Sequence, residues 1–273
     1  MKQLAESTAT FTMKFFISLA CLLAVLTPTL GRLIVGGHES KPHSRPYQVA
    51  IYNRKDIKDH YCGGTLVHKR WVVSAAHCGK GHHGFAGLGL HDKTNHSEAG
   101  QQIIRGTWHL HPDYNGGTLD NDISLFHLGR DAHIGNGKIE AIRIAKTRPH
   151  KAMKLLVSGW GATASDGSAR SDVLMEVVVR AQSMHHCRKV YGSSSITDNM
   201  FCAAASGKDF CQGDDGGPIV GHYGHGIHKN STTLEGIASW GSGCADPAHP
   251  GVYVTVGNYC DWIKTTTKDA VQC

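Results

Sequence analysis

The chain has 273 residues, of which 40% are hydrophobic and 18% are charged, and its formal net charge is +6 at pH 7. This composition excludes an intrinsically disordered chain, and 33 glycines without a three-residue period exclude collagen. One substantial core in one large domain is therefore expected. Since no run of five or more Lys or Arg occurs, we expect neither a nucleic acid nor an anionic membrane as a partner.

The first apolar run covers residues 15–26 and follows Lys14. It is too short to cross a bilayer and has the length of the apolar core of a secretory signal. We predict a signal peptide over 1–27, a propeptide remnant over 28–33 and a folded domain over 34–273. A short membrane anchor or a buried strand is the alternative for the apolar run. The mature chain is expected to be secreted, soluble and monomeric.

Short apolar stretches separated by clusters of Gly, Asp, Asn and His follow this leader. They are typical of strands, and no helix-length amphipathic pattern alternates with them, so an all-β barrel or sandwich is predicted. Only the C-terminal tail indicates a helix, because Tyr259, Trp262 and Ile263 fall on one helical face. The predicted strand stretches are 47–51, 71–73, 102–104, 155–157 and 251–256.

Nine cysteines and 20 histidines are further features of the composition. Cys21 lies in the predicted leader, and the even set that remains indicates disulfides in a secreted chain. No Cys-x2-Cys pair occurs, and His222, His225 and His228 are interpreted as solvated loop residues, so no metal is expected. The histidines predict a surface whose positive charge rises as the pH falls from 7.5 to 5.5.

Four sequence blocks contain the candidate catalytic and activation residues: IVGG at 34–37, WVVSAAHC at 71–78, DISL at 122–125 and CQGDDGGP at 211–218. With these blocks in this order, the chain resembles the chymotrypsin-like (trypsin) serine protease family over residues 34–273. The resemblance implies an all-β fold of two six-stranded antiparallel Greek-key barrels with a short C-terminal helix. It also implies an active site in the cleft between the barrels.

The resemblance assigns His77 as the general base and Asp122 as the carboxylate that orients it. At the position of the serine nucleophile the chain has Asp215, and the backbone N–H groups of Gly213 and Asp215 would hold the oxyanion. A carboxylate is a weak nucleophile with no proton to give at neutral pH, and two acidic neighbours favour the charged, non-basic form of His77. We expect no useful amide hydrolysis. Two alternatives stay open: Asp215 activates a water molecule, or the residue reflects a sequencing error or an engineered change.

The primary specificity pocket is a second departure from the family. The resemblance places Asp209 at its base, as in proteases that cleave after Lys or Arg, but Phe210 stands where those enzymes carry a small residue. We expect the phenyl ring to fill or cap the pocket; a ring turned out to solvent is the alternative. The other substrate-binding residues implied are Ser239, Trp240, Gly241 and Gly251, of which the two glycines keep the pocket walls open.

The cleavage site for maturation is a third departure from the family. In the family, a cut before IVGG frees an ammonium group, here on Ile34, that pairs with the acid corresponding to Asp214. Because Leu33 follows Arg32, a cut after Arg32 leaves one residue too many for this pair. A cut after Leu33 restores it.

Cys260 and Cys273 have no family partner. In a straight helix they would lie about 20 Å apart, so they pair only if the last turns unwind, and otherwise one thiol is free. The disulfides implied by the resemblance are Cys62–Cys78, Cys187–Cys202 and Cys211–Cys244.

Two sequons, at Asn95 and Asn230, are candidate glycosylation sites. Some relatives bind calcium in the loop that spans residues 89–102 here. Leu90 and Gln101 replace its usual glutamates, so neither calcium nor any other cofactor is expected.

The leading hypothesis is a secreted, catalytically inactive serine protease homologue that acts by binding proteins. A narrower resemblance is to the inactivated serine protease paralogues of the scabies mite, relatives of the mite group 3 allergens. It implies interference with host complement or another proteolytic cascade. The alternatives are a weak trypsin-like endopeptidase and a non-catalytic cofactor of an endogenous protease cascade.

Overall fold

The computed structural model describes residues 37–54, 60–79, 81–95, 97–162, 170–205, 213–223, 231–242 and 248–273. They belong to one compact unit of the chain. The predicted signal peptide, the propeptide remnant and Ile34 lie outside the described residues. Within the described part of the chain, no helix combines the length and apolar character that a membrane crossing requires.

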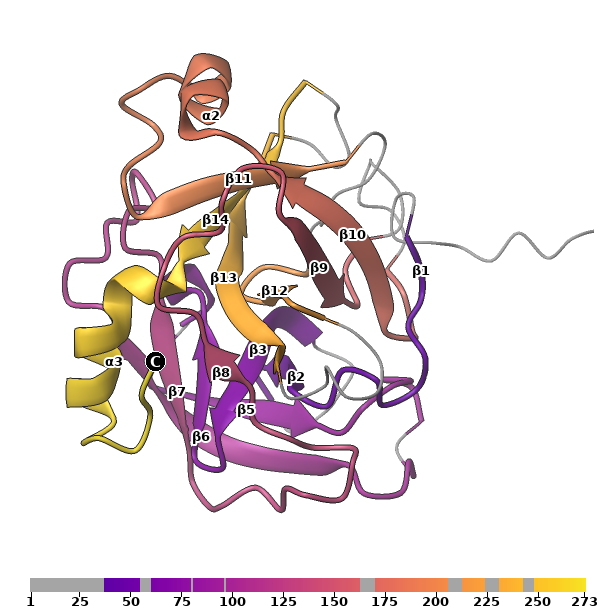
Figure 1. Cartoon of the computed structure of the whole chain (residues 1–273). Coiled ribbons are helices and arrows are strands. Elements are labelled where there is room, and N and C mark those ends of the chain that lie inside the picture. Colours follow the sequence, from indigo (N-terminus) through magenta and orange to yellow (C-terminus); the bar gives the residue numbers. More distant parts are fainter. Residues whose placement is uncertain are drawn as a thin grey trace, which may run out of the picture. The chain divides into compact units, whose positions relative to one another are not determined.

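The first half of the compact unit is a closed antiparallel barrel (Figure 1). Its strands form because β-branched and aromatic side chains such as Val49, Ile51, Val73 and Phe126 are fully buried in one apolar core. In ring order the strands are β2 (Gln48–Tyr52), β3 (His60–His68), β4 (Trp71–Ser74), β7 (Ser124–Leu128), β6 (Gln102–Leu110) and β5 (His83–Leu88).

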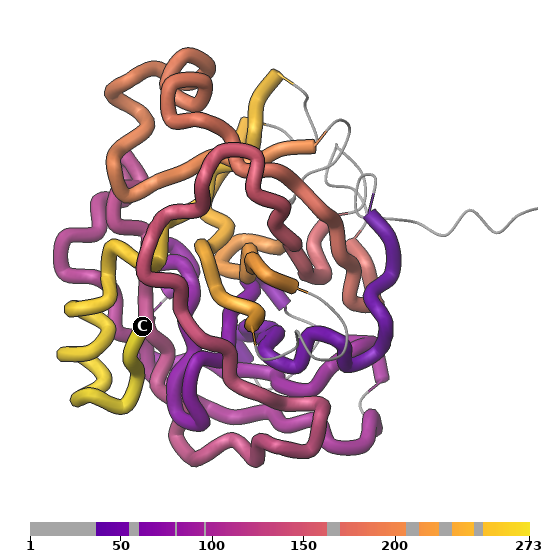
Figure 2. Tube along the Cα trace, viewed as in Figure 1, coloured from indigo at the N-terminus to yellow at the C-terminus, as the bar shows by residue number. Residues whose placement is uncertain are grey.

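The second half is another antiparallel ring, which closes because β9 pairs with both β10 and β12. Figure 2 follows the chain from the first barrel, mostly in indigo and magenta, to the second, mostly in rose, orange and yellow. Two short strands join the second barrel: β1 (His38–Glu39) pairs with β10, and β8 (Arg143–Ile144) runs parallel to β13. In ring order the barrel strands are β9 (Lys154–Gly159), β10 (Met175–Ala181), β11 (Met200–Ala204), β14 (Gly251–Thr255), β13 (Thr233–Trp240) and β12 (Pro218–Gly221).

The expected architecture of two six-stranded antiparallel barrels is confirmed. Each stretch predicted as a strand overlaps a strand of the structure. The predicted C-terminal helix is also present, as α3 (Cys260–Thr266), and follows the 3-10 turn η3 (Val256–Tyr259).

A second helix, α2 (Met184–Tyr191), corrects the expectation that only the tail is helical. Its apolar pattern is too weak to detect, because Cys187 is its one buried residue. The helix is instead stabilised at its start, where the Ser183 hydroxyl accepts a hydrogen bond from the His186 backbone N–H.

The disulfides Cys62–Cys78 and Cys187–Cys202 are confirmed, and Cys211–Cys244 lies outside the described residues. The expectation for the tail is resolved in favour of pairing. Helix α3 ends at Thr266, and Lys268 and Asp269 then adopt φ angles of 52° and 65°. This turn brings the chain back, so that the Cα atoms of Cys260 and Cys273 lie 5.8 Å apart in a further disulfide.

Candidate active site

His77 and Asp122 lie together on the first barrel. His77 belongs to the 3-10 turn η1 (Ala76–Cys78), which follows β4, and Asp122 lies just before β7. The fully buried Asp122 accepts a hydrogen bond from the His77 backbone N–H at 2.9 Å through Oδ1, and its Oδ2 lies 2.8 Å from His77 Nδ1. These two contacts orient the ring, with Nδ1 directed at the Asp122 carboxylate and Nε2 on the far edge of the ring.

Ser239 completes this half of the site. It lies in β13 of the second barrel, is buried, and donates its hydroxyl proton to Asp122 Oδ2 at 2.6 Å. Sequence reasoning placed Ser239 only among the pocket residues. Its hydrogen bond to the buried acid is an additional role, and a sequence pattern could not show it because the two residues lie on different barrels.

The loop that carries Asp215 is docked against the first barrel by backbone contacts. The Gly63 N–H of β3 donates to the Asp215 carbonyl oxygen at 2.7 Å. A Cβ on Gly63 would approach the Gly217 Cα to 2.8 Å, and a Cβ on Gly216 would overlap the Ser74 hydroxyl. Gly216 also has a φ of 76°, in the left-handed region that favours glycine. The position of residue 215 is therefore fixed by its glycine neighbours, independently of its own side chain.

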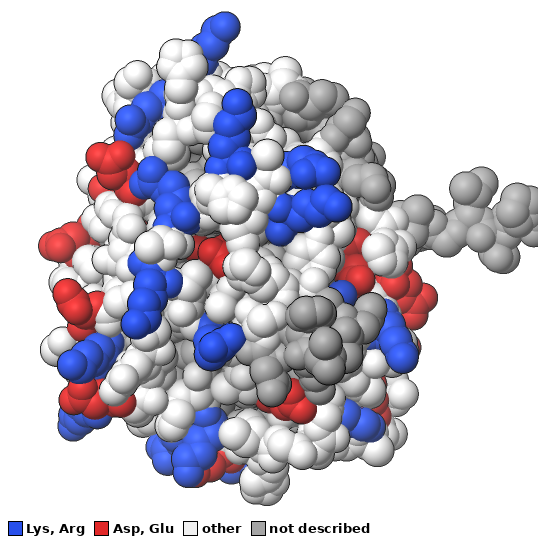
Figure 3. All heavy atoms as spheres, in the orientation of Figure 1, with Lys and Arg blue, Asp and Glu red and all other residues white. Residues whose placement is uncertain are grey.

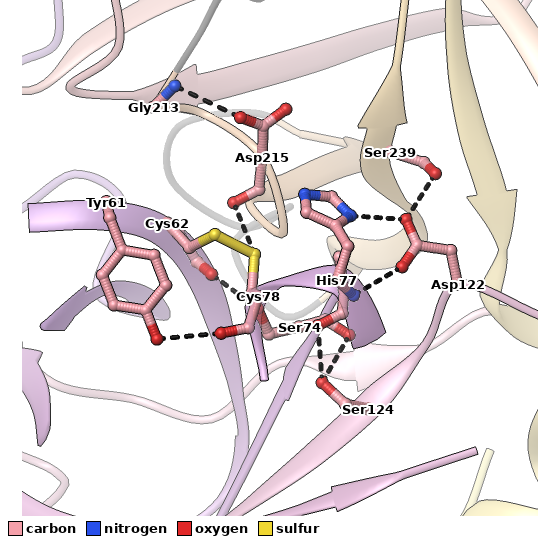
Figure 4. The surroundings of a disulfide bond; sticks show 12 residues. Tyr61, Cys62, Ser74, His77, Cys78, Asp122, Ser124, Gly213, Asp215 and Ser239 are labelled. Carbon is pink, nitrogen blue, oxygen red and sulfur yellow. Dashed lines mark hydrogen bonds and ion pairs between the residues drawn. A yellow bond between two sulfur atoms is a disulfide. The ribbon is translucent and has the colours of Figure 1, made fainter. Parts of the chain in front are cut away.

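The Asp215 carboxyl group is turned toward Gly213 (Figure 4). The Gly213 N–H donates to Asp215 Oδ2 at 3.3 Å. Burial raises the pKa of the Asp215 carboxyl group above its ordinary value, the nearby Asp122 adds to this effect, and His77 and the Gly213 N–H oppose it. The acid thus contacts one of the two backbone donors expected to hold an oxyanion.

Asp214, the neighbouring acid, is buried against two glycines of the second barrel. Its Oδ1 accepts a hydrogen bond from the Gly161 N–H at 2.7 Å, and a Cβ on either Gly159 or Gly161 would overlap its carboxyl group. The sequence GWG at 159–161 is therefore required to seat Asp214. Its expected partner, the Ile34 ammonium group, lies outside the described residues.

The specificity pocket is described only in part. Asp209 and Phe210 lie outside the described residues, so the expectation that the phenyl ring fills the pocket stays a prediction. Trp240 packs edge-on against the Tyr191 ring at a centroid distance of 4.9 Å. The remaining two pocket residues are Gly241, which is exposed, and Gly251, which is buried at the start of β14.

The predicted glycosylation sites and loop histidines lie partly within and partly outside the described residues. Asn95 is exposed, whereas Asn230, His225 and His228 lie outside the described residues. Within the described part of the chain, the donor atoms of Cys62, His77 and Cys78 are close enough to hold a metal ion. Both sulfur atoms belong to one disulfide, so this group does not offer the thiolates that a metal would require.

Comparisons with known proteins agree with this geometry. The family model described as Trypsin matches residues 34–263. The chain belongs to the trypsin family. It is 39% identical over 236 residues to Cationic trypsin-3 of Rattus norvegicus, a match that covers 85% of this chain and 89% of that protein. It is 36% identical over 263 residues to Trypsin of Xenopus laevis, with 93% and 98% covered.

A solved structure of the family has the same fold. Neuropsin, a serine protease expressed in the limbic system of mouse brain, superposes with a TM-score of 0.75 and is 35% identical. The match covers 85% of this chain and 98% of neuropsin. The described site therefore combines a trypsin-family frame and a His77–Asp122 pair with an acid at residue 215.

Proposed function

We propose that this chain is a secreted trypsin-family protein that does not hydrolyse peptide bonds and acts by binding other proteins. The observation that carries the proposal is the contact of the Asp215 carboxyl group with the Gly213 N–H, at the residue that the resemblance assigns to the nucleophile position. His77 and Asp122 have the arrangement of a general base and its orienting acid, so the proposed loss of activity is confined to the nucleophile.

The chemistry of a carboxylate supports the absence of acyl transfer. A serine hydroxyl gives its proton to the base as its oxygen bonds to the carbonyl carbon, and the amine then leaves. Attack by Asp215 would instead form a mixed anhydride. In the tetrahedral intermediate the carboxylate is a far better leaving group than the amine, so the intermediate returns to substrate and the peptide bond survives.

The position of the carboxyl group supports the same conclusion. The rate of acyl transfer depends on backbone N–H groups that have no other acceptor and can donate to the negative charge that develops on the substrate oxygen. Here the Gly213 N–H is already engaged by Asp215. An ionised Asp215 would also repel the oxyanion. Both effects act on the transition state rather than on binding, so a peptide or protein segment can still occupy the cleft.

A weak trypsin-like endopeptidase is the rival function, and the intact His77–Asp122 pair favours it. It would require Asp215 to orient a water molecule that His77 deprotonates. The Asp215 carboxyl group is turned to Gly213, however, so one of its two oxygens is engaged by the Gly213 N–H instead of by a water molecule. The non-hydrolytic function is therefore the better supported of the two.

The location and partner belong to the same proposal. The apolar run over 15–26 supports secretion. The narrower resemblance to inactivated scabies-mite paralogues leads us to propose a component of host complement or another proteolytic cascade as the bound protein. Recovery of partners from serum and from an extract of the source organism separates this role from that of a cofactor in an endogenous cascade.

The test is turnover of an arginyl ester by the chain beginning at Ile34, measured beside the Asp215→Ser variant. We expect no turnover above background for the parent. The variant should be faster by about 10⁴-fold or more, since loss of the serine in a comparable triad costs about 10⁶ in turnover. The Asp113→Ser variant is the matched control, because Asp113 is an exposed acid outside the site, and it should stay at background.

Two outcomes would contradict the proposal. Turnover by the parent at a rate typical of trypsin would show that Asp215 does not prevent hydrolysis. An inactive Asp215→Ser variant with a native fold would show that residue 215 is not what limits activity, and would direct attention to Phe210 or to the N-terminus.

A further inference from the structure

The second barrel carries exposed basic side chains that sequence reasoning did not connect. Residues 141–154 contain several Lys and Arg but no Asp or Glu. Ile142 and Ile144 are buried, and because strand side chains alternate, Arg143 points outward between them. We define the basic band by its exposed members, Arg143, Lys146, Lys151, Lys154, Arg180 and Lys189.

Figure 3 is drawn in the orientation of Figure 1, and Lys and Arg side chains predominate over the upper part of the face that it shows. Lys146, Lys151, Lys154 and Lys189 form no ion pair with any described residue. Of the acids near the band, Asp198 is paired with Arg188, outside the band, Glu235 is buried, and Asp261 lines a hollow together with Lys146.

Lys154 and Arg180 are direct cross-strand partners in the β9–β10 register. Like charges placed opposite each other on antiparallel strands repel and lower stability. The Arg180 guanidinium donates to the Ala152 carbonyl oxygen at 3.2 Å, a contact that holds its side chain but does not neutralise it. An anion bound over this pair would remove the repulsion, so the pair is suited to a ligand that supplies negative charge.

One end of the band opens into a hollow of about 560 Å³. Arg143, Lys146 and His222 line it together with the Gln272 side chain. Two cations, an imidazole and an amide donor suit a sulfate group and the hydroxyl groups of a sugar. Because the remaining charges extend from this hollow over separate elements, a single small anion would neutralise only part of the band.

We propose that the basic band binds a linear sulfated polysaccharide. A nucleic acid is disfavoured because Tyr191 is the one Phe, Tyr or Trp residue of β8, β9, β10 and α2, and its ring packs against Trp240 and His249 rather than offering an open face for unpaired bases. A folded acidic protein is disfavoured because such interfaces need apolar anchors, and Val178 is the one large apolar side chain of β8, β9, β10 and α2 that is exposed. A flexible polyanion requires only charges that are spaced along its path.

The test is binding of the full chain to heparin, measured as retention on heparin–agarose and as affinity over a range of NaCl concentrations. The triple variant K146E/K151E/K154E removes the centre of the band. The triple variant K41E/R54E/R105E changes the net charge equally at exposed sites outside the band. All six side chains are exposed, and unchanged circular dichroism and melting temperature will confirm that both variants fold.

We expect the parent to bind, the band variant to lose at least tenfold in affinity at 150 mM NaCl, and the control variant to stay within about twofold to threefold of the parent. The slope of log affinity against log salt should fall by about 2 in the band variant, since each ionic contact with a linear polyanion contributes about 0.7 to 0.9. Equal losses in the two triple variants would overturn the proposal. Tighter binding of a single-stranded oligonucleotide or of phosphatidylserine vesicles than of heparin would overturn it as well. The assay is independent of turnover, so its outcome does not depend on the activity of residue 215.

Discussion

The two halves of the candidate site differ in whether their side chains match those that a serine protease requires. On the first barrel, His77 and Asp122 keep each hydrogen bond that a general base and its orienting acid require. On the second barrel, the loop around Asp215 is docked on β3 by the Gly63–Asp215 backbone hydrogen bond, but it has an acid at the position that the resemblance assigns to the nucleophile. The two halves therefore differ in the side chain at residue 215, whereas the described backbone contacts hold both halves in place.

This difference shows that backbone and side-chain requirements at the loop are separate. Gly216 is required by close contacts with β3 and β4, and these contacts help hold the two barrels together. Gly217 is required within the loop itself, because a Cβ there would meet the Asp214 carbonyl oxygen at 2.7 Å. The side chain of residue 215 makes no comparable packing demand, because its carboxyl group is held mainly by the Gly213 N–H. A substitution at residue 215 can thus change function without changing the fold.

The prediction with the largest expected effect tests whether His77 and Asp122 can still act as a general base and its orienting acid. In the Asp215→Ser chain, Asp122→Asn should lower turnover by about 10⁴, because the His77 proton would no longer be fixed on Nδ1. In the parent chain the same substitution should leave the background rate unchanged. Equal turnover of the single and double variants in an arginyl ester assay would show that the His77–Asp122 pair does not act as a general base.

A prediction with a smaller expected effect tests whether Gly216 holds the backbone of the loop around Asp215. Gly216→Ala should lower the free energy of unfolding by about 3 kcal/mol, since the added Cβ meets Ser74 and φ is 76°. Gly116→Ala is the control, because a Cβ there finds its nearest neighbour at 3.7 Å, and it should change stability by less than about 0.5 kcal/mol. Urea unfolding measures both, and equal stabilities would contradict the account of the loop.

The third prediction concerns His60, where the first barrel meets Trp160 of the second. Burial, reinforced by Lys93 and Arg170, lowers the pKa of His60 to about 3. The unfolded chain therefore binds a proton below about pH 6.5 that the folded chain does not bind, and stability falls as the pH drops from 6.5 toward 3. His60→Phe should reduce this slope by about 1 kcal/mol per pH unit. Urea unfolding at pH 7.5, 5.5 and 4.5 measures it, and parallel curves for parent and variant would contradict the assignment.

The smallest expected effect returns to Asp215. Burial raises the pKa of this carboxyl group, so its ionised form costs the folded chain stability above that pKa. Asp215→Asn should therefore stabilise the protein by about 1 kcal/mol at pH 7, and the gain should shrink as acid protonates the parent. The exposed Asp113→Asn variant should show no such pH-dependent gain. A destabilised Asp215→Asn chain at pH 7 would show that the buried charge is well compensated.

Much of the fold could be predicted from the sequence because glycine-rich blocks mark places where backbones touch. GWG at 159–161 and GG at 216–217 are dictated by contacts that tolerate no Cβ, so these residues identify the architecture. The helix α2 was missed because its stability comes from the Ser183 cap and the disulfide at Cys187 rather than from an apolar face.

The finer features of the site depend on tertiary geometry that one sequence does not encode locally. The direction of the Asp215 carboxyl group depends on which backbone N–H the loop presents to it, and the role of Ser239 depends on a contact between the barrels. The basic band depends on tertiary geometry in part: its members between 143 and 154 are close in sequence, but their connection to Arg180 is not. Lys154 and Arg180 are far apart in sequence and become neighbours only through the β9–β10 register.

The central claim is that residue 215 cannot form a covalent bond with an acyl-type electrophile, and a phosphonate probe that reacts with activated serines tests it directly. The parent chain and the Asp215→Ser variant are incubated with the probe, and intact mass and peptide mapping are recorded. We expect no adduct on the parent and one adduct, on residue 215, in the variant. A covalent adduct on Asp215 of the parent chain would contradict the account.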